Sequence, residues 1–358
     1  MAGVVFLDEF NDREIEILTM IAHGRTNHEI AETLFLSVNT VRWYNKQIYS
    51  KLGVHKRTLA VARAREWGLI QDVDDQDIEL EQRVHFTQSF DGTILAYALV
   101  GNGPPLVKSA NYMCHLEYDW QSPIWRHWME AFASEYTFIR YDERGSGLSD
   151  WDVEDVSFEA WVKDLEVVVD TLEIDQFPLL GMSQGGPVSI AYAVKHPEKV
   201  THLILYGSYA RGWRNRDLTE QQKQEERLIL DLIRIGWGKD NPGFRHAFSA
   251  YYMPDGSPEQ WAAFDELHRR SATPENAARL RETMHSIDVQ ELCKQVQVPT
   301  LVIHCRDDAG VPFAEGRLLA SLIPNAQFVS LEGKNHIITE DEPAWQGFLQ
   351  AVDRFLSE

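Results

Sequence analysis

Cysteine and long apolar runs are scarce in this sequence of 358 residues. The three cysteines, Cys114, Cys293 and Cys305, are too few for a disulfide framework and lack the spacing of metal ligands. No run of 18 apolar residues occurs, and the opening residues "MAGVVFLDEF" carry two acids and no basic leader. We therefore expect a cytoplasmic protein in a reducing compartment, with no membrane span, secretory signal, metal ion or cofactor.

Acidic residues are missing from one segment of an otherwise acidic chain. The formal net charge is -21, yet residues 37–65 contain seven Lys and Arg side chains and no Asp or Glu. Residues 1–70 hold nine basic and eight acidic side chains, whereas the other 288 residues hold 25 and 47. This division predicts an N-terminal unit that presents positive charge to a partner and a separate, acidic C-terminal unit.

An acidic stretch separates the two units. Six of the ten residues from Asp72 to Glu81 are acidic, a composition that resists burial in a core. We therefore predict a solvated linker over residues 71–82, between a domain at residues 1–70 and a larger domain at residues 83–358.

Four short helical patterns cover the N-terminal unit, each followed by a turn signal. Apolar residues recur at helical spacing within residues 11–24, 26–36, 37–53 and 56–68. Ser37 is a candidate cap for the third helix, which Gly53 ends. Two helices joined by a short turn, the second of them cationic, are the pattern of a helix-turn-helix DNA reader.

The missing acids are explained if the partner is double-stranded DNA. DNA carries a phosphate charge about every 1.7 Å of helix axis, so acidic side chains on the docking face would repel it. The expected phosphate contacts come from Arg42, Lys46, Lys51, Lys56 and Arg57. The expected contacts to base edges come from Asn39, Thr40, Trp43 and Asn45, near the start of the second helix. The alternative is a solvated basic helix that binds nothing.

The N-terminal sequence closely resembles the LuxR-type helix-turn-helix domain over about sixty residues. The resemblance rests on the motifs "REIEIL", "G-TN-EIA", "LS-NTVR", "I-SKLGV" and "RT-AV-A". It implies a four-helix module with its recognition helix around residues 38–52. The module is expected to bind DNA as a homodimer whose two copies contact each other through the last helix. The pair Trp43-Tyr44 departs from the family, which usually has a small or polar residue followed by His, so sequence specificity is expected to differ.

From Arg83 onward, short β-rich runs alternate with helical patterns, which predicts a mainly parallel sheet flanked by helices. The candidate strands are residues 83–88, 94–101, 105–110, 138–142, 177–182, 200–207, 300–305 and 326–331. Catalytic residues are expected in the loops that follow the carboxyl ends of these strands. Together with the N-terminal helices, these strands predict a multidomain fold class, an all-α four-helix domain followed by an α/β domain.

Three of these strand ends carry the residue types of a serine hydrolase. "GMSQGG" follows the fifth strand and places Ser183 between glycines before a helical run, as a sharp strand-turn-helix connection requires. "HCRDDAGVP" follows the seventh strand and offers Asp307 or Asp308, and "LEGKNHI" follows the eighth and offers His336. The order Ser, Asp, His predicts a catalytic triad. The competing interpretation is a set of unrelated polar loop residues.

These residues are similar to the α/β-hydrolase superfamily over about 270 residues. "YDERGSGLSD", residues 141–150, also matches its turn motif "D-x-R-G-x-G-x-S". The resemblance favours Asp308 as the acid, because the family's acid stands three residues before the Val of a Val-Pro pair. It also implies a helical lid at residues 207–298, with amphipathic helices in residues 222–238 and 274–287, that shapes the pocket.

The oxyanion hole of such an enzyme needs two backbone N–H donors. Gln184, the residue after the nucleophile, is expected to give one, and Asn111 or Tyr112 the other. The chain has "SANYMCHLEYDW" where the superfamily commonly has "HG", so this loop is expected to differ in detail. Asn111, Tyr112 and Trp120 are candidate substrate-binding residues, whereas core packing is favoured for Trp125 and Trp128.

The two parts together predict a one-component transcriptional regulator. Its DNA reader binds duplex DNA as a homodimer. Its hydrolase-fold domain senses a small ester, thioester or lactone-like ligand, and hydrolyses it if the triad turns over. The alternative is a serine hydrolase whose N-terminal helices serve only oligomerisation.

Overall fold

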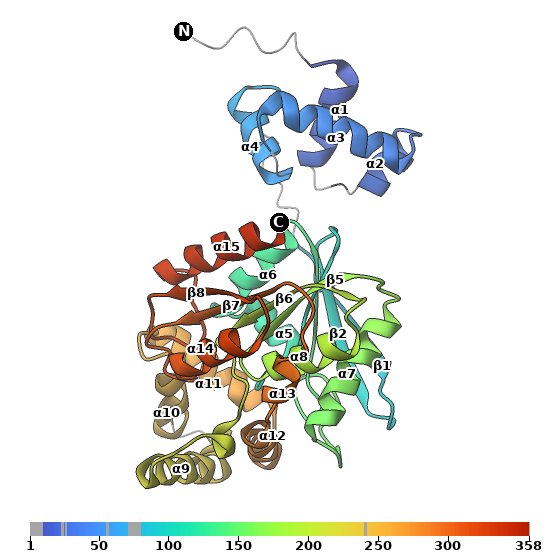
Figure 1. The fold of residues 1–358 in the computed structure, drawn as a ribbon. Coiled ribbons are helices and arrows are strands. Elements are labelled where there is room, and N and C mark those ends of the chain that lie inside the picture. Colours follow the sequence, from blue (N-terminus) through green and yellow to red (C-terminus); the bar gives the residue numbers. More distant parts are fainter. Residues whose placement is uncertain are drawn as a thin grey trace. The chain divides into compact units, whose positions relative to one another are not determined.

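The computed structural model describes residues 10–22, 25, 27–54, 57–70, 80–239 and 242–357. The chain divides into two compact units, one built around the N-terminal helices and the other around a β-sheet (Figure 1). The linker predicted over residues 71–82 lies outside the described residues except for its last three. Among the described residues, no helix is long and apolar enough to cross a membrane.

Within residues 10–70, as far as the structure describes them, four helices form the N-terminal unit at the positions that the sequence predicts. They are α1 (Asp12–Ala22), α2 (Asn27–Thr33), α3 (Val38–Leu52) and α4 (Arg57–Glu66). α1 begins at a reciprocal cap, in which the Asn11 N–H donates to Glu14 Oε2 and the Glu14 N–H to Asn11 Oδ1, both at 2.9 Å. α3 begins at Ser37, whose side chain accepts from the Thr40 N–H, and ends at Gly53 with φ 66°.

The N-terminal unit has a hydrophobic core of its own. Ile17 and Leu18 of α1, Ile30 of α2, and Val41 and Ile48 of α3 are completely buried in it. α4 adds buried alanines to the same core. Because this core joins all four helices, it fixes the rotation of α3 about its axis and so the set of side chains that α3 exposes.

An eight-stranded sheet forms the centre of the second unit, in the order β1-β2-β4-β3-β5-β6-β7-β8. The strands are β1 (Arg83–Gln88), β2 (Ile94–Val100), β3 (Pro105–Lys108), β4 (Thr137–Tyr141), β5 (Phe177–Met182), β6 (Val200–Tyr206), β7 (Thr300–Cys305) and β8 (Gln327–Leu331). β1 and β2 are antiparallel, and the pairs β3 with β5, β5 with β6, β6 with β7 and β7 with β8 are parallel. All the predicted strands are present, and the mainly parallel sheet is confirmed.

Helices cover this sheet and bury its central strands, whereas the edge strand β1 is largely exposed. They are α5 (Leu116–Gln121), α6 (Arg126–Ala133), α7 (Phe158–Thr171), α8 (Gly185–Lys195), α14 (Phe313–Leu322) and α15 (Pro343–Leu356). Trp128 of α6 packs against Trp345 and Phe348 of α15, with ring centroids 4.9 Å and 4.8 Å away. Trp128 is therefore a core residue, as expected. The three cysteines are also buried, as free thiols.

A helical insertion connects β6 to β7. Its described elements are η2 (Trp213–Asn215), α9 (Glu220–Gly236), α10 (Pro242–Tyr252), α11 (Pro258–Ser271), α12 (Pro274–Ser286) and α13 (Gln290–Cys293). The two amphipathic helices predicted here correspond to α9 and α12. A buried ion pair joins them, since Arg281 Nε lies 3.0 Å from Glu226 Oε1. Figure 1 shows α9, α10 and α12 grouped beyond the end of the sheet.

Candidate catalytic site and DNA-contacting surface

Ser183 stands on the sharp turn between β5 and α8. Its φ of 51° is positive, a conformation that a non-glycine residue rarely adopts. Glycines allow the chain to pass so closely here: a Cβ on Gly181 would lie 2.7 Å from the Gly186 Cα, and one on Gly185 2.5 Å from Ser109 Oγ. The strained turn holds the Ser183 side chain at the carboxyl edge of the sheet.

The structure brings Ser183, His336 and Asp308 together from three separate strand ends. Ser183 Oγ lies 2.8 Å from His336 Nε2, and His336 Nδ1 lies 2.9 Å from each Asp308 carboxylate oxygen. The backbone N–H groups of Gly310 and Val311 donate to Asp308 Oδ1 at 2.8 and 2.9 Å. This geometry allows His336 to take a proton from Ser183 at Nε2 while Nδ1–H donates to Asp308.

The neighbouring carboxylate does not take part in this arrangement. Asp307 is exposed, whereas Asp308 is buried. Asp307 contacts the loop that carries His336 through its backbone, because its N–H donates to the Gly333 carbonyl at 3.2 Å. The geometry therefore favours Asp308 as the partner of the imidazole.

Two tyrosines that the sequence analysis did not identify hold the backbone of His336. Its N–H donates to the Tyr252 carbonyl at 2.8 Å, and its carbonyl accepts from the Tyr206 hydroxyl at 3.0 Å. Tyr252 ends α10, and its hydroxyl accepts from Arg281 Nη1 at 2.7 Å. The helical insertion is thus joined directly to the loop of the catalytic candidate. No motif marks Tyr252, so only the tertiary structure identifies it.

The predicted oxyanion donors differ in what their side chains do. Gln184 immediately precedes α8, so its N–H lies at a helix N-terminus, where the first N–H groups have no intrahelical partner. Tyr112 reaches the helical insertion, where its hydroxyl donates to the Ala277 carbonyl at 3.1 Å. The Asn111 amide accepts from Lys108 and donates to the Tyr112 carbonyl at 3.2 Å. The Asn111 side chain is therefore engaged within the protein, which differs from the substrate contact expected of it.

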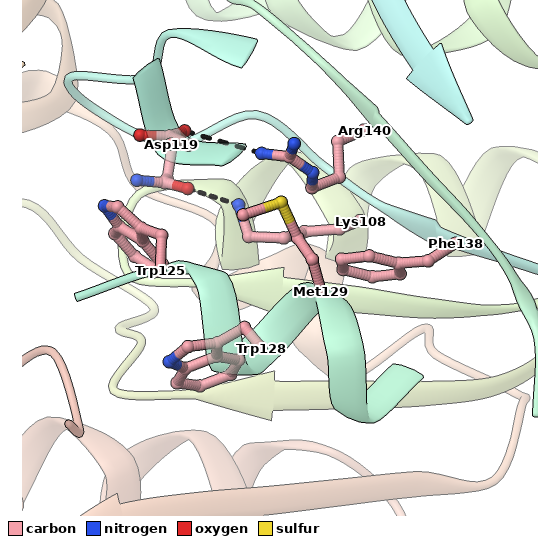
Figure 2. Close-up of a pocket in the computed structure, with 8 residues that line it drawn as sticks. Lys108, Asp119, Trp125, Trp128, Met129, Phe138 and Arg140 are labelled. Carbon is pink, nitrogen blue, oxygen red and sulfur yellow. Dashed lines mark hydrogen bonds and ion pairs between the residues drawn. The ribbon is translucent and has the colours of Figure 1, made fainter. Parts of the chain in front are cut away.

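Lys108 and Asn111 line a small cavity together with Asp119, Trp125 and Arg140 (Figure 2). Lys108 Nζ donates to the Ser109 carbonyl at 3.3 Å, and Arg140 Nη1 lies 3.5 Å from Asp119 Oδ2. Burial lowers the pKa of Lys108 to about 8 and raises the pKa of Asp119 to about 7. The cavity volume of about 20 Å³ has room for a water molecule and is far too small for a substrate.

Two tryptophans of this region, Trp120 and Trp125, have neighbours within their own part of the hydrolase domain. Trp120 is half-buried, and its ring lies 3.7 Å from the Arg126 guanidinium, a cation–π contact within the same segment. Trp125 is buried and lines the small cavity. Nothing among the described residues joins Trp120 to Ser183, so its predicted role in substrate binding has no geometric support.

One face of α3 exposes part of the expected set of DNA-contacting residues. Asn39, Arg42 and Lys46 are exposed, and Trp43 is 56% exposed, which is unusual for an aromatic ring. Thr40 is half-buried, with Oγ1 2.7 Å from Ser37 Oγ. An exposed cationic face of this kind can meet a phosphate backbone.

Two residues of α3 that are also predicted to contact DNA, Asn45 and Lys51, are engaged inside the module. Asn45 is buried and donates to Asn27 Oδ1 at 2.8 Å, so its side chain does not face solvent. Lys51 Nζ lies 2.7 Å from the carboxylate of Glu14, which is 3% exposed. These positions lie on or beside the apolar stripe of α3, which packs into the core.

Arg57 is also used internally, because its Nη2 donates to the backbone carbonyls of Ile21 and Arg25. The remaining predicted phosphate contact, Lys56, lies outside the described residues. Structural roles thus compete with DNA contact at Lys51 and Arg57, whereas Arg42 and Lys46 present their charges to solvent.

The chain belongs to the alpha/beta hydrolase fold family, whose model matches residues 113–343. A second family, described as bacterial regulatory proteins of the luxR family, matches residues 8–64. The protein is therefore a fusion of a LuxR-type helix-turn-helix domain with an α/β hydrolase domain.

Two of the relatives of this chain are hydrolases by name. Pyrrolizixenacetamide deacetylase from Xenorhabdus hominickii is 28% identical over 268 residues, which cover 73% of this chain and 94% of that protein. A 2-hydroxymuconate semialdehyde hydrolase from Pseudomonas sp. (strain CF600) is 29% identical over 270 residues, 72% of this chain and 85% of that one. Among solved structures, the enol-lactonase from Burkholderia xenovorans LB400 has a TM-score of 0.61 at 23% identity, covering 76% of this chain and 100% of its own.

Proposed function

We propose that the protein is a one-component transcriptional regulator. Its helix-turn-helix domain binds duplex DNA as a homodimer, and its hydrolase domain binds and hydrolyses a small ester, thioester or lactone-like ligand. The observation that carries this proposal is the hydrogen-bonded set Ser183, His336 and Asp308 in one chain with a helix that exposes Arg42 and Lys46. The deacetylase among the relatives supports acyl transfer as the class of reaction.

The proposed reaction proceeds in two acyl-transfer steps. Ser183 Oγ attacks the acyl carbon while His336 Nε2 takes its proton, and Asp308 stabilises the resulting imidazolium. The backbone N–H groups of Gln184 and Tyr112 stabilise the oxyanion. His336 then protonates the leaving group, and an acyl group stays on Ser183. In the second step His336 takes a proton from the water that attacks the acyl group, and it returns this proton to Ser183 Oγ as the acyl–oxygen bond breaks and the acid is released.

Covalent labelling tests the catalytic half of the proposal. A fluorophosphonate should form an adduct at Ser183, detected by mass spectrometry, and His336→Ala should remove most of the labelling. Asp307→Asn is the matched control, because Asp307 is exposed and adjacent to the proposed acid. An unlabelled Ser183 in the folded wild-type protein would mean that the domain has no acyl-transfer activity.

The same adduct tests whether occupancy of the hydrolase site changes DNA binding. Affinity for a mixed-sequence duplex is measured by fluorescence anisotropy at one salt concentration, with labelled and unlabelled protein. Coupling of about 1.4 kcal/mol changes that affinity about tenfold. Ser183→Ala treated with the reagent is the control, since it cannot form the adduct. Equal affinities of labelled and unlabelled protein would reduce the regulator to two independent activities on one chain.

A second candidate function is a serine hydrolase whose N-terminal helices serve only oligomerisation. Leu59 of α4 is compatible with it, because this aliphatic side chain is 51% exposed and suits a helix contact between two copies, a contact that the dimeric regulator would also use. Light scattering combined with the DNA measurement separates the two candidates. A dimer without DNA affinity supports the second candidate, whereas a dimer that binds DNA with strong salt dependence supports the regulator.

A further inference from the structure

A buried carboxyl group lies against the residue that follows Ser183. Glu143, two residues after β4, is 2% exposed, and its Oε1 accepts from Gln184 Nε2 at 2.6 Å. The Glu143 N–H donates to Cys114 Sγ at 3.3 Å, which fixes the backbone beneath the pair. The other oxygen atom of each side chain, Glu143 Oε2 and Gln184 Oε1, finds no partner among the described residues.

In the part of the chain that the structure describes, the two cations that act on Glu143, Arg144 and Lys108, both hold other partners. Arg144 lies next in the sequence, but its guanidinium pairs with Asp164 at 2.7 Å and with Asp91 at 2.6 Å. Lys108 donates to the Ser109 carbonyl and the Asn111 amide. An ionised Glu143 would therefore be a buried charge without a paired cation, which is costly in the protein interior.

The Asp164 carboxylate opposes a negative charge on Glu143, whereas Arg144 and Lys108 offset only part of the cost of burying that charge. Four further groups interact electrostatically with Glu143, the Cys114 thiol and the phenols of Tyr112, Tyr141 and Tyr209. Each is neutral when protonated and negative when deprotonated, so none can supply a positive charge. Burial raises the pKa of Glu143 to about 8, against the hydrogen bond from Gln184. At neutral pH the side chain is therefore mostly an uncharged carboxylic acid.

We propose that Glu143, as a neutral carboxyl group, is a positioning residue that holds Gln184 so that its backbone N–H can stabilise the oxyanion formed at Ser183. The inference rests on the proposed acyl-transfer function. Gln184 stands between the nucleophile and the first turn of α8, so fixing its side chain fixes the orientation of that N–H group. A negative charge at Glu143 would oppose the developing oxyanion electrostatically, which gives the neutral form its advantage.

Two substitutions at this position separate the shape of the side chain from its charge. Glu143→Gln keeps a carbonyl oxygen for the Gln184 amide and stays neutral at every pH. Glu143→Leu fills similar space but leaves the buried Gln184 Nε2 without an acceptor. The rate of Ser183 labelling by a fluorophosphonate is the readout, measured from pH 6 to pH 10 with each protein shown to be folded by circular dichroism.

The wild-type labelling rate should fall as the pH rises through about 8, the pKa of Glu143. Glu143→Gln should match the wild type at pH 7 and lose this fall, and Glu143→Leu should be slower by at least about tenfold at pH 7. Lys108 also titrates with a pKa of about 8, but it is present in every variant. The difference between wild type and Glu143→Gln therefore reports the ionisation of Glu143, including its electrostatic effect on Lys108.

The outcomes distinguish this inference from the proposed function. Identical pH profiles for the wild type and Glu143→Gln would overturn the positioning role, while labelling of Ser183 would leave acyl transfer standing. A Ser183 that is never labelled in the wild type would overturn both. Should Glu143→Leu fail to fold, the comparison of wild type with Glu143→Gln still decides the matter, because that pair differs only in the ability to ionise.

Discussion

Replacing Asp308 by Asn should inactivate the proposed nucleophile while leaving its surroundings in place. Asp308 Oδ1 accepts from the Gly310 and Val311 N–H groups, so the amide oxygen of the variant is expected to stay at that position. The amide nitrogen then occupies the position of Oδ2, 2.9 Å from His336 Nδ1, with its hydrogens facing the ring. The amide oxygen also stays 2.9 Å from Nδ1, but the amide hydrogens and the loss of the negative charge disfavour a proton on Nδ1, so the imidazole protonated at Nε2 becomes favoured.

An imidazole protonated at Nε2 cannot accept the Ser183 proton across the 2.8 Å contact. The turnover number should therefore fall by about 10⁴-fold, the loss expected when a triad histidine takes the wrong tautomer. This corresponds to about 5 kcal/mol of transition-state stabilisation. Asp307→Asn makes the same chemical change on an exposed side chain one position away and should leave the rate nearly unchanged.

The assay is the hydrolysis of a chromogenic aryl ester, together with the rate of Ser183 labelling by a fluorophosphonate. Both rates should fall in Asp308→Asn and persist in Asp307→Asn. An Asp308→Asn protein that retains more than a tenth of the wild-type rate would refute the assignment of the acid. Loss of activity in Asp307→Asn alone would show that the geometry around His336 has been misinterpreted.

Four further predictions follow from contacts described above. Lys46→Ala should reduce the salt dependence of DNA binding by about one unit of log-log slope per protomer without changing thermal stability. Lys51→Ala should destabilise the module by about 1–3 kcal/mol, because the buried Glu14 carboxylate keeps its hydrogen bond from the Asn11 N–H but loses its cation. Because Glu143 binds its proton more tightly in the folded state, the stability of the wild type should fall as the pH rises from the unfolded pKa of 4.5 to the folded pKa of about 8. Across that window, urea titrations should show Glu143→Gln gaining a few kcal/mol of unfolding free energy relative to the wild type. Gly186→Ala should destabilise the protein by about 1–3 kcal/mol and slow Ser183 labelling, because the new methyl group would overlap Ser208, whose hydroxyl donates to the Ser183 carbonyl. An unchanged melting temperature and labelling rate would contradict this prediction.

The sequence predicts most reliably what the backbone alone determines. The strands follow from runs of β-branched and apolar residues, and the turn at Ser183 follows from glycines that tolerate close backbone approach. Because those strands are parallel, their carboxyl ends share one edge, and Ser183 and His336 meet although 153 residues separate them. The catalytic roles of these residues remain predictions until labelling tests them.

The sequence predicts side-chain environments less well, and Asn45 illustrates a case where the information was present. Val41, Asn45, Ile48 and Leu52 are buried on α3 at helical spacing, so Asn45 belongs to the apolar stripe by position. Its polarity suggested a base contact, but the core fixes the rotation of the helix. The partner of Lys51, by contrast, is Glu14, 37 residues earlier, and no local pattern indicates that pairing.

Because all three native thiols are buried, cysteines introduced at exposed positions can be labelled selectively with fluorescent dyes. Burial raises the pKa of Cys293 and of Cys305 to about 12 and raises that of Cys114 as well, so none presents a reactive thiolate near neutral pH. A cysteine introduced at Phe35, which is 96% exposed, and another at Leu228, which is 68% exposed, would be the accessible pair. Energy transfer between dyes at these two positions would report the separation of the two domains, with and without DNA, in a protein that keeps every native cysteine.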